Sequence, residues 1–178
     1  MEKIWQSTSR ACIIGTLVVI AMFFYTVHAS AQQFKLDYNT DSTAVLRLVN
    51  DSGSCTSTWQ LPYPVFRFAT ADINGDGSTD AVVGVFKASR YFPVPSRRVF
   101  IFKNFEGDVR PLWLGSRLGG ELIDFAIIND KIRAIEKTDT GYAVSDYIWQ
   151  GFGMGFETLI ATCNTLDDSY TFLPSTSP

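Results

Sequence analysis

The sequence predicts an all-β domain of antiparallel strands, and three observations support this class. Short runs rich in β-branched and aromatic residues recur along the chain after residue 31. Turn-forming residues separate these runs at intervals of roughly eight to fifteen residues. No stretch of about twelve or more residues beyond residue 31 has the periodicity and caps of an amphipathic helix. This pattern is typical of a β-meander in a compact or incomplete β-propeller-like fold, or alternatively in a sandwich or a barrel.

The predicted strands follow one another with short connections. In chain order, they are residues 44–49, 65–69, 80–87, 99–104, 123–128, 131–137, 143–149 and 156–162. The clearest turn signals lie at 51–54, 106–108, 129–130 and 138–141. Asn129 and Asp130 separate two alternating runs, as expected for a two-residue hairpin turn.

The N-terminal segment predicts export. Lys3 and Arg10 precede an almost entirely apolar run, 11–27, and Ala29-Ser30-Ala31 supplies the small residues of a cleavage site. These are the parts of a signal peptide, 1–31, which places the mature protein in the periplasm, at the cell surface or outside the cell. The alternative is an uncleaved anchor, which would be the protein's only contact with a membrane.

Cleavage after Ala31 leaves residues 32–178, enough for one domain. We expect the all-β domain to span 32–166. Residues 167–178 are rich in Ser, Thr and Pro and predict a disordered tail. Of the 15 basic and 18 acidic residues, 13 and 17 remain after cleavage, and a net negative chain is a poor nucleic-acid binder. A basic stretch, 87–110, fits a solvated hairpin face or a surface for an anionic partner.

Asp72-Ile-Asn-Gly-Asp-Gly-Ser-Thr-Asp80 predicts a calcium loop. Oxygen-bearing side chains recur at every second position around two glycines, and Ca²⁺ takes about six to eight oxygen ligands. Asp72, Asn74, Asp76 and Asp80 would give side-chain oxygens, and Ser78 its backbone carbonyl. Because the three carboxylates repel one another without metal, calcium should order the loop.

The flanks of this loop are predicted strands rather than the helices of an EF-hand. A strand, an Asp-x-Asn-x-Asp-Gly-x-x-Asp loop and a second strand containing Gly84 resemble the FG-GAP or VCBS repeat, the blade unit of integrin-like β-propellers. The resemblance, to a single copy, implies calcium at Asp72, Asn74, Asp76, Ser78 and Asp80. With segments 113–120 and 151–156, the whole chain also resembles a group of short exported bacterial proteins of unknown role.

The mature chain has few residues suited to catalysis. The single histidine, His28, lies in the predicted signal peptide, which excludes histidine-based catalysis and His-ligated zinc. Cys55 and Cys163 are the cysteines beyond residue 31; an oxidising compartment would favour a disulfide between them, and two buried thiols are the alternative. We therefore expect a non-catalytic binding or structural module.

Two other functions remain open. The first is a carbohydrate-binding module with exposed aromatic side chains, for which Tyr91, Phe92 and Trp113 are candidates because prolines flank them. The second is a glycoside hydrolase based on paired carboxylates, with the candidates Glu121, Asp124 and Glu136. The partner would be an unidentified protein or glycan.

Overall fold

The computed structural model describes residues 32–115 and 118–174, and this part of the chain is nearly all β-structure with antiparallel pairing throughout. The strands are β1 (Gln33–Thr40), β2 (Thr43–Val49), β3 (Cys55–Leu61), β4 (Val65–Ala71), β5 (Asp80–Lys87), β6 (Ser96–Phe105), β7 (Asp108–Leu114), β8 (Glu121–Ile128), β9 (Lys131–Thr138), β10 (Gly141–Trp149) and β11 (Met154–Cys163). One short helix, α2 (Leu166–Tyr170), follows them. The predicted all-β class is confirmed, and none of the described sheets closes into a barrel.

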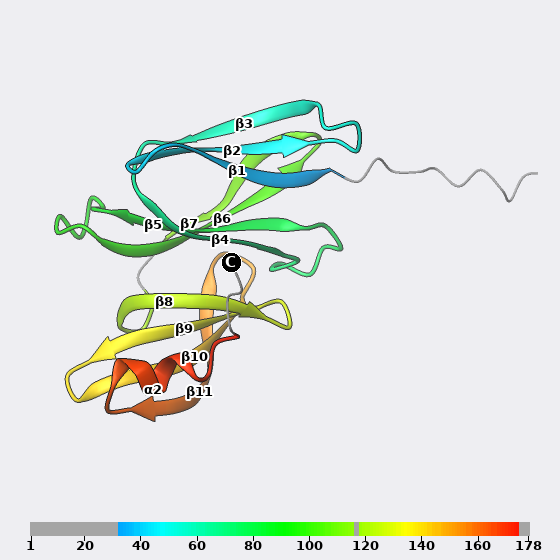
Figure 1. The fold of residues 1–178 in the computed structure, drawn as a ribbon. Helices are drawn as coiled ribbons and strands as arrows, with labels where there is room; N and C mark the ends of the chain where they lie inside the picture. Colours follow the sequence, from blue (N-terminus) through cyan, green and yellow to red (C-terminus); the bar gives the residue numbers. More distant parts are fainter. Residues whose placement is uncertain (1–31, 116–117, 175–178) are drawn as a thin grey trace, which may run out of the picture. The chain divides into compact units, whose positions relative to one another are not determined.

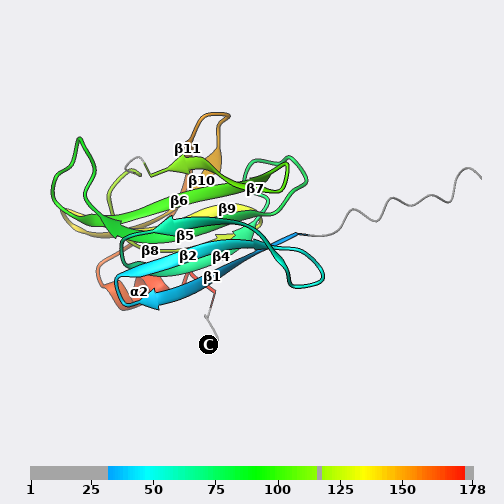
Figure 2. The same ribbon diagram turned by 90° about the horizontal axis from the view of Figure 1, so that it is seen from above.

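Consecutive strands form three separate sheets. The first sheet has the order β1-β2-β3, the middle sheet β4-β5-β6-β7, and the third sheet β11-β10-β9-β8. The three sheets lie one over another as layers, with the middle sheet between the other two (Figure 1). Seen from above, the strands of the three layers overlap one another (Figure 2).

The middle sheet is buried on both faces, and this explains its continuous apolar strands. Along β5, Val83 and Val85 pack into a core shared with the first sheet, whereas Val82 packs into a core shared with the third. On β6, Phe100 and Phe102 belong to the first of these cores. Successive side chains of a strand point to opposite faces, so both faces of β5 and β6 need apolar residues.

The predicted turns all lie between paired strands. Asn129 and Asp130 both have positive φ, 51° and 59°, and join β8 to β9. Positive φ at both central residues is the requirement of the type I′ hairpin turn, which Asn and Asp tolerate better than most residues. Glu106 and Gly107, at φ 55° and 88°, connect β6 to β7 in the same way.

The predicted strands are confirmed at all eight positions, and three further strands are present. The additional strands are β1, β3 and β7. Each lies at an edge of its sheet. Pro111 lies within β7, where an edge position tolerates the missing N–H donor.

The prediction of a disordered tail from residue 167 is wrong for the part that the structure describes. Residues 166–170 form α2, whose Ser169 is fully buried. Thr165 caps the helix, and its Oγ1 accepts a hydrogen bond from the N–H of Asp168 at 3.2 Å. The helix packs on β10 and β11, and Arg133 Nη1 on β9 donates to the carbonyl oxygen of Phe172 at 3.4 Å. Residues 175–178 lie outside the described part.

An ion pair joins the middle and third sheets. Arg67 on β4 donates from Nε to Asp124 Oδ1 on β8 at 2.6 Å, and its Nη2 donates to Oδ2. The side chains are 22% and 9% exposed, so water screens this bidentate pair only weakly. It fixes the position of β8 against β4, next to the contact between their aromatic rings.

Candidate functional site

The acidic loop lies between β4 and β5, and Asp72 organises its backbone. Asp72 Oδ1 accepts hydrogen bonds from the N–H groups of Gly75 at 2.8 Å and Asp76 at 3.1 Å. Its Oδ2 accepts from the N–H of Gly77 at 2.8 Å. Gly75 and Gly77 have φ of 72° and 83°, a conformation that glycine adopts without steric cost. The two glycines therefore allow the loop to fold around one carboxylate.

Asn74 and Asp76 form a second set of contacts within the loop. Asn74 Nδ2 donates to Asp76 Oδ2 at 2.8 Å, and the N–H of Ser78 donates to Asp76 Oδ1 at 2.9 Å. These hydrogen bonds, that from Asn74 first, stabilise the charged form and lower the pKa of Asp76. The loop thus brings Asp72, Asn74, Asp76 and Ser78 into one hydrogen-bonded turn.

Asp80 lies beneath this turn and differs from the other carboxylates. It is the first residue of β5 and has no exposed surface. Its Oδ2 accepts a hydrogen bond from the N–H of Ile73 at 3.1 Å, whereas its Oδ1 is buried without a hydrogen-bond partner among the described residues. Burial, aided by the negative charges of Asp76 and Asp72, raises the pKa of Asp80 to about 6.

Most carboxylate oxygens of the loop accept hydrogen bonds from the loop itself, from backbone N–H groups and from the side chain of Asn74. Within residues 32–115 and 118–174, no three His, Cys, Asp or Glu side chains are grouped as a metal ion would require. Each carboxylate oxygen has more than one acceptor site, so an oxygen that holds an N–H group can also face a cation. The donor set is all oxygen, which suits a hard cation rather than zinc or copper.

The three aromatic candidates do not form one platform. Tyr91 is 81% exposed and Phe92 45% exposed on the connection between β5 and β6. Trp113 lies on β7, partly buried, and packs against the core between the middle and third sheets. Its Nε1 is within 3.1 Å of the position that a Cβ on Gly153 would occupy. Trp113 therefore contributes to packing.

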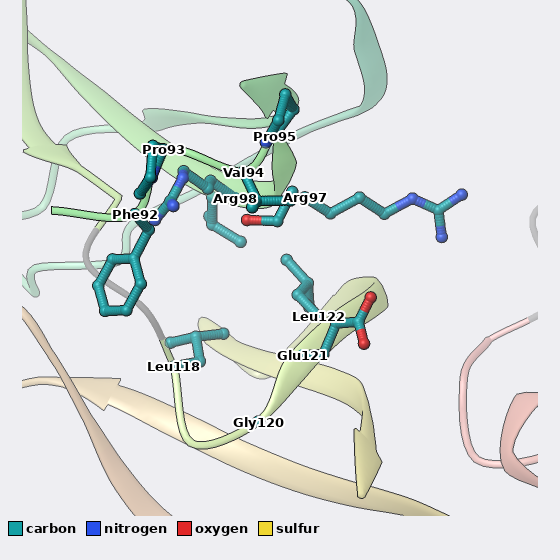
Figure 3. A pocket seen from close by; sticks show the side chains of 12 residues that line it. Phe92, Pro93, Val94, Pro95, Arg97, Arg98, Leu118, Gly120, Glu121 and Leu122 are labelled. Carbon is teal, nitrogen blue, oxygen red and sulfur yellow. The ribbon is translucent and has the colours of Figure 1, made fainter. Parts of the chain in front are cut away.

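Phe92 borders a cavity of about 360 Å³ that sequence reasoning did not identify. Residues 92–99 form one wall and residues 118–122 the other, and Figure 3 shows these two segments facing one another. Most of the lining is apolar, from Phe92, Pro93, Val94, Leu118 and Leu122. Arg98 is the buried charged residue in the lining, at 5% exposure. The signal for this cavity in the sequence was Arg98, an arginine beside an apolar strand segment.

Two of the three carboxylates considered for glycoside hydrolysis, Asp124 and Glu136, have structural partners among the described residues. Asp124 is paired with Arg67. Glu136 is buried, and its oxygens accept hydrogen bonds from the N–H of Gly120 at 2.7 Å and from the hydroxyl of Tyr147 at 2.6 Å. Burial and then this hydrogen bond raise the pKa of Tyr147. The network fixes the segment that leads into β8.

The two cysteines do not form the expected disulfide. Cys55 begins β3 in the first sheet and Cys163 ends β11 in the third, and both thiols are free. The middle sheet separates these layers (Figure 1). Cys55 is exposed and Cys163 is partly exposed, so the alternative of two buried thiols does not describe Cys55 either.

Comparison with protein-family models finds no match, and comparison with curated proteins finds none either. The fold and the site therefore carry the functional argument. The predicted signal peptide, residues 1–31, lies outside the described residues. Between residues 32 and 174, leaving out 116 and 117, the structure has no helix with the length and apolarity of a membrane span.

Proposed function

We propose that the protein is an exported, calcium-stabilised β domain that acts as a binding or structural module without catalytic activity. The observation that supports calcium most directly is Asp80, whose fully buried carboxylate has an oxygen without a hydrogen-bond partner beneath the acidic loop. A buried charge without a counter-charge is unfavourable, and a divalent cation in the loop would compensate it.

The loop residues fit such a cation chemically. Asp72, Asn74, Asp76 and Asp80 would offer side-chain oxygens, and Ser78 its backbone carbonyl, as the sequence predicts. Asp76 and Asp72 already contribute negative charge that raises the pKa of Asp80. Calcium would replace this repulsion with attraction and fix the connection between two strands of the middle sheet.

A non-catalytic role is supported by the state of the polar side chains. The single histidine of the sequence is at position 28, so the described residues contain none. Asp124 and Glu136 are held by Arg67 and Tyr147. Tyr91 and Phe92 are exposed on the connection between β5 and β6, where they could contact a protein or glycan partner. The reading of residues 1–31 as a signal peptide supports export.

Thermal unfolding with calcium and with a chelator tests the metal proposal. Calcium at about a hundred times its Kd should stabilise the protein by about 2.7 kcal/mol and raise the Tm by several degrees relative to chelator. Magnesium should do less, because it favours near-ideal octahedral sites and keeps its waters. The Asp80→Asn variant should lose the response to calcium, and so should Asp76→Ala, at an exposed position of the loop.

The matched control is Asp139→Asn, a charge removal at an exposed turn between β9 and β10. This variant should respond to calcium as the unaltered protein does. If the unaltered protein ignores calcium, or if Asp80→Asn and Asp76→Ala both respond in full, the loop holds no calcium and the proposal fails.

A further inference from the structure

The cavity between residues 92–99 and 118–122 contains a buried charge that no described carboxylate neutralises. Arg98 is 5% exposed and is in none of the ion pairs of residues 32–115 and 118–174. Its Nε donates to the carbonyl oxygen of Lys87 at 3.2 Å, and its Nη1 to that of Gly115 at 3.4 Å. Carbonyl oxygens orient the guanidinium but leave its charge uncompensated, which is costly in a buried place.

The guanidinium lies at one end of the cavity. In Figure 3 it is beside Phe92 and Pro93, and its Cζ atom is 5.7 Å from the centre of the Phe92 ring. Nη2 donates no hydrogen bond to a described residue, so a donor remains for a ligand. Two neighbouring N–H groups of one guanidinium match the two oxygens of a carboxylate.

The other charged groups of the lining do not serve Arg98. Arg97 points away from Arg98 in Figure 3, and its Nη1 donates to the carbonyl oxygen of Ile123. Glu121 is exposed, and its carboxylate also points away from Arg98 in this view. The cavity therefore has one buried positive charge at one end.

The rest of the lining is suited to a hydrocarbon rather than to a sugar. Phe92, Pro93 and Val94 face Leu118 and Leu122 across the cavity (Figure 3). Sugars need several converging polar side chains, whereas here Ser96 and the charged residues are the polar members of the lining. The volume, about 360 Å³, is at the small end of the range for small-molecule sites.

From these features we propose that the cavity binds a small monocarboxylate with an apolar body. The carboxylate pairs with Arg98, and the hydrocarbon lies between the two walls. One guanidinium compensates one negative charge, so a monoanion fits better than a phosphate dianion. This site is separate from the acidic loop, and its occupant does not depend on calcium.

Calorimetric titration of the purified protein in chelator tests the proposal with ligands of one length. Octanoate should bind at least about tenfold more tightly than octanol, because a charge-assisted hydrogen bond is added. Octylammonium, which has the same body and the opposite charge, should bind more weakly than octanol. Equal binding of octanoate and octanol, or no binding of octanoate, would overturn the proposal. So would tighter binding of a hydrophobic peptide with a free C-terminus, which would assign the surface to a protein partner.

Variants locate the charge that selects the carboxylate. Arg98→Gln should reduce the preference for octanoate over octanol about tenfold and leave octanol binding nearly unchanged. Val94 lines the cavity and is 75% exposed, so its replacement keeps the fold even if Arg98→Gln does not. Val94→Glu should weaken octanoate binding by repulsion, and the matched Val94→Gln should not. An unchanged preference in Arg98→Gln, or equal effects of Glu and Gln at position 94, would contradict the assignment.

Discussion

At the residue scale, Gly84 allows the middle and third sheets to approach one another. A Cβ at this position would lie 2.7 Å from Phe66 Cζ and 2.9 Å from Phe125 Cε1, closer than real contacts allow. The two rings meet edge to face with centroids 6.1 Å apart. The glycine is therefore required by close packing rather than by an unusual φ.

We expect Gly84→Ala to lower the free energy of unfolding by about 1–3 kcal/mol, the usual cost of overpacking. Phe66→Leu should also destabilise the protein, because it removes an aromatic ring from the contact. In the double variant the shorter side chain makes room for the added methyl group. In urea unfolding, the double variant should therefore lose less free energy of unfolding than the two single variants lose in sum. Strict additivity would show that the methyl group meets no resistance from Phe66.

At the element scale, α2 depends on its cap and on the third sheet, since isolated helices this short are marginal. Thr165 Oγ1 accepts from the N–H of Asp168 and donates to Asp168 Oδ2 at 2.6 Å. Ser169 Oγ donates to the carbonyl oxygen of Leu166 at 2.5 Å. The helix thereby covers a face of the third sheet on which Ile135 and Val144 are buried and paired.

Thr165→Ala should cost about 1 kcal/mol, the typical value of a lost helix cap. The loss should appear both in denaturant unfolding and as faster hydrogen exchange of the Thr171 amide, which bonds to Asp168 within the last turn. Thr165→Ser keeps the hydroxyl and serves as the control. If the alanine variant exchanges no faster than the serine variant, the cap contributes nothing to the helix.

How much of these elements the sequence predicts depends on their surroundings. β5 is confirmed at its predicted bounds because it is buried on both faces and reads as an uninterrupted apolar run. β3 has one buried residue, and its polar sequence gives little periodic signal. The helix α2 is too short to show helical periodicity in the sequence, although Thr165 and Asp168 have the spacing of a capping box.

The candidate sites also differ in how far the sequence predicts them. Residues 72–80 form a turn between β4 and β5, as expected where oxygen-bearing side chains and glycines act locally on a short segment. Calcium binding by this turn stays a prediction. The cavity joins residues 92–99 to residues 118–122, and only the stacking of sheets brings these segments together. The prediction of a Cys55–Cys163 disulfide is wrong for the same reason, because the sequence does not show that the two cysteines lie in different layers.

At the scale of the whole described domain, the middle sheet belongs to both hydrophobic cores. Trp59 packs in the core shared with the first sheet and Trp149 in the core shared with the third. Loss of either outer sheet would expose an apolar face of β5 and β6. The three sheets should therefore unfold together rather than one at a time.

Variants with a single tryptophan test this cooperativity. A protein that retains only Trp59 and one that retains only Trp149, with phenylalanine at the other tryptophan positions, should each have the same denaturation midpoint by fluorescence as by far-ultraviolet circular dichroism. Circular dichroism of each variant also controls for any destabilisation by the replacements. A Trp59 midpoint below the circular dichroism midpoint would mean that the first sheet opens as an independent unit.

The outer faces of the stack limit how such an architecture can be enlarged by duplication. Lys35, Arg47 and Thr58 form a polar row across the first sheet, and α2 covers the outer side of the third. Polar or covered ends are what stop a repetitive array from growing. A duplicated sheet could therefore bury both of its faces only between two existing sheets, and not on the outside of the stack. An additional sheet should therefore be tolerated when it is inserted at the connection after β3 or after β7, because it would then pack between two hydrophobic faces.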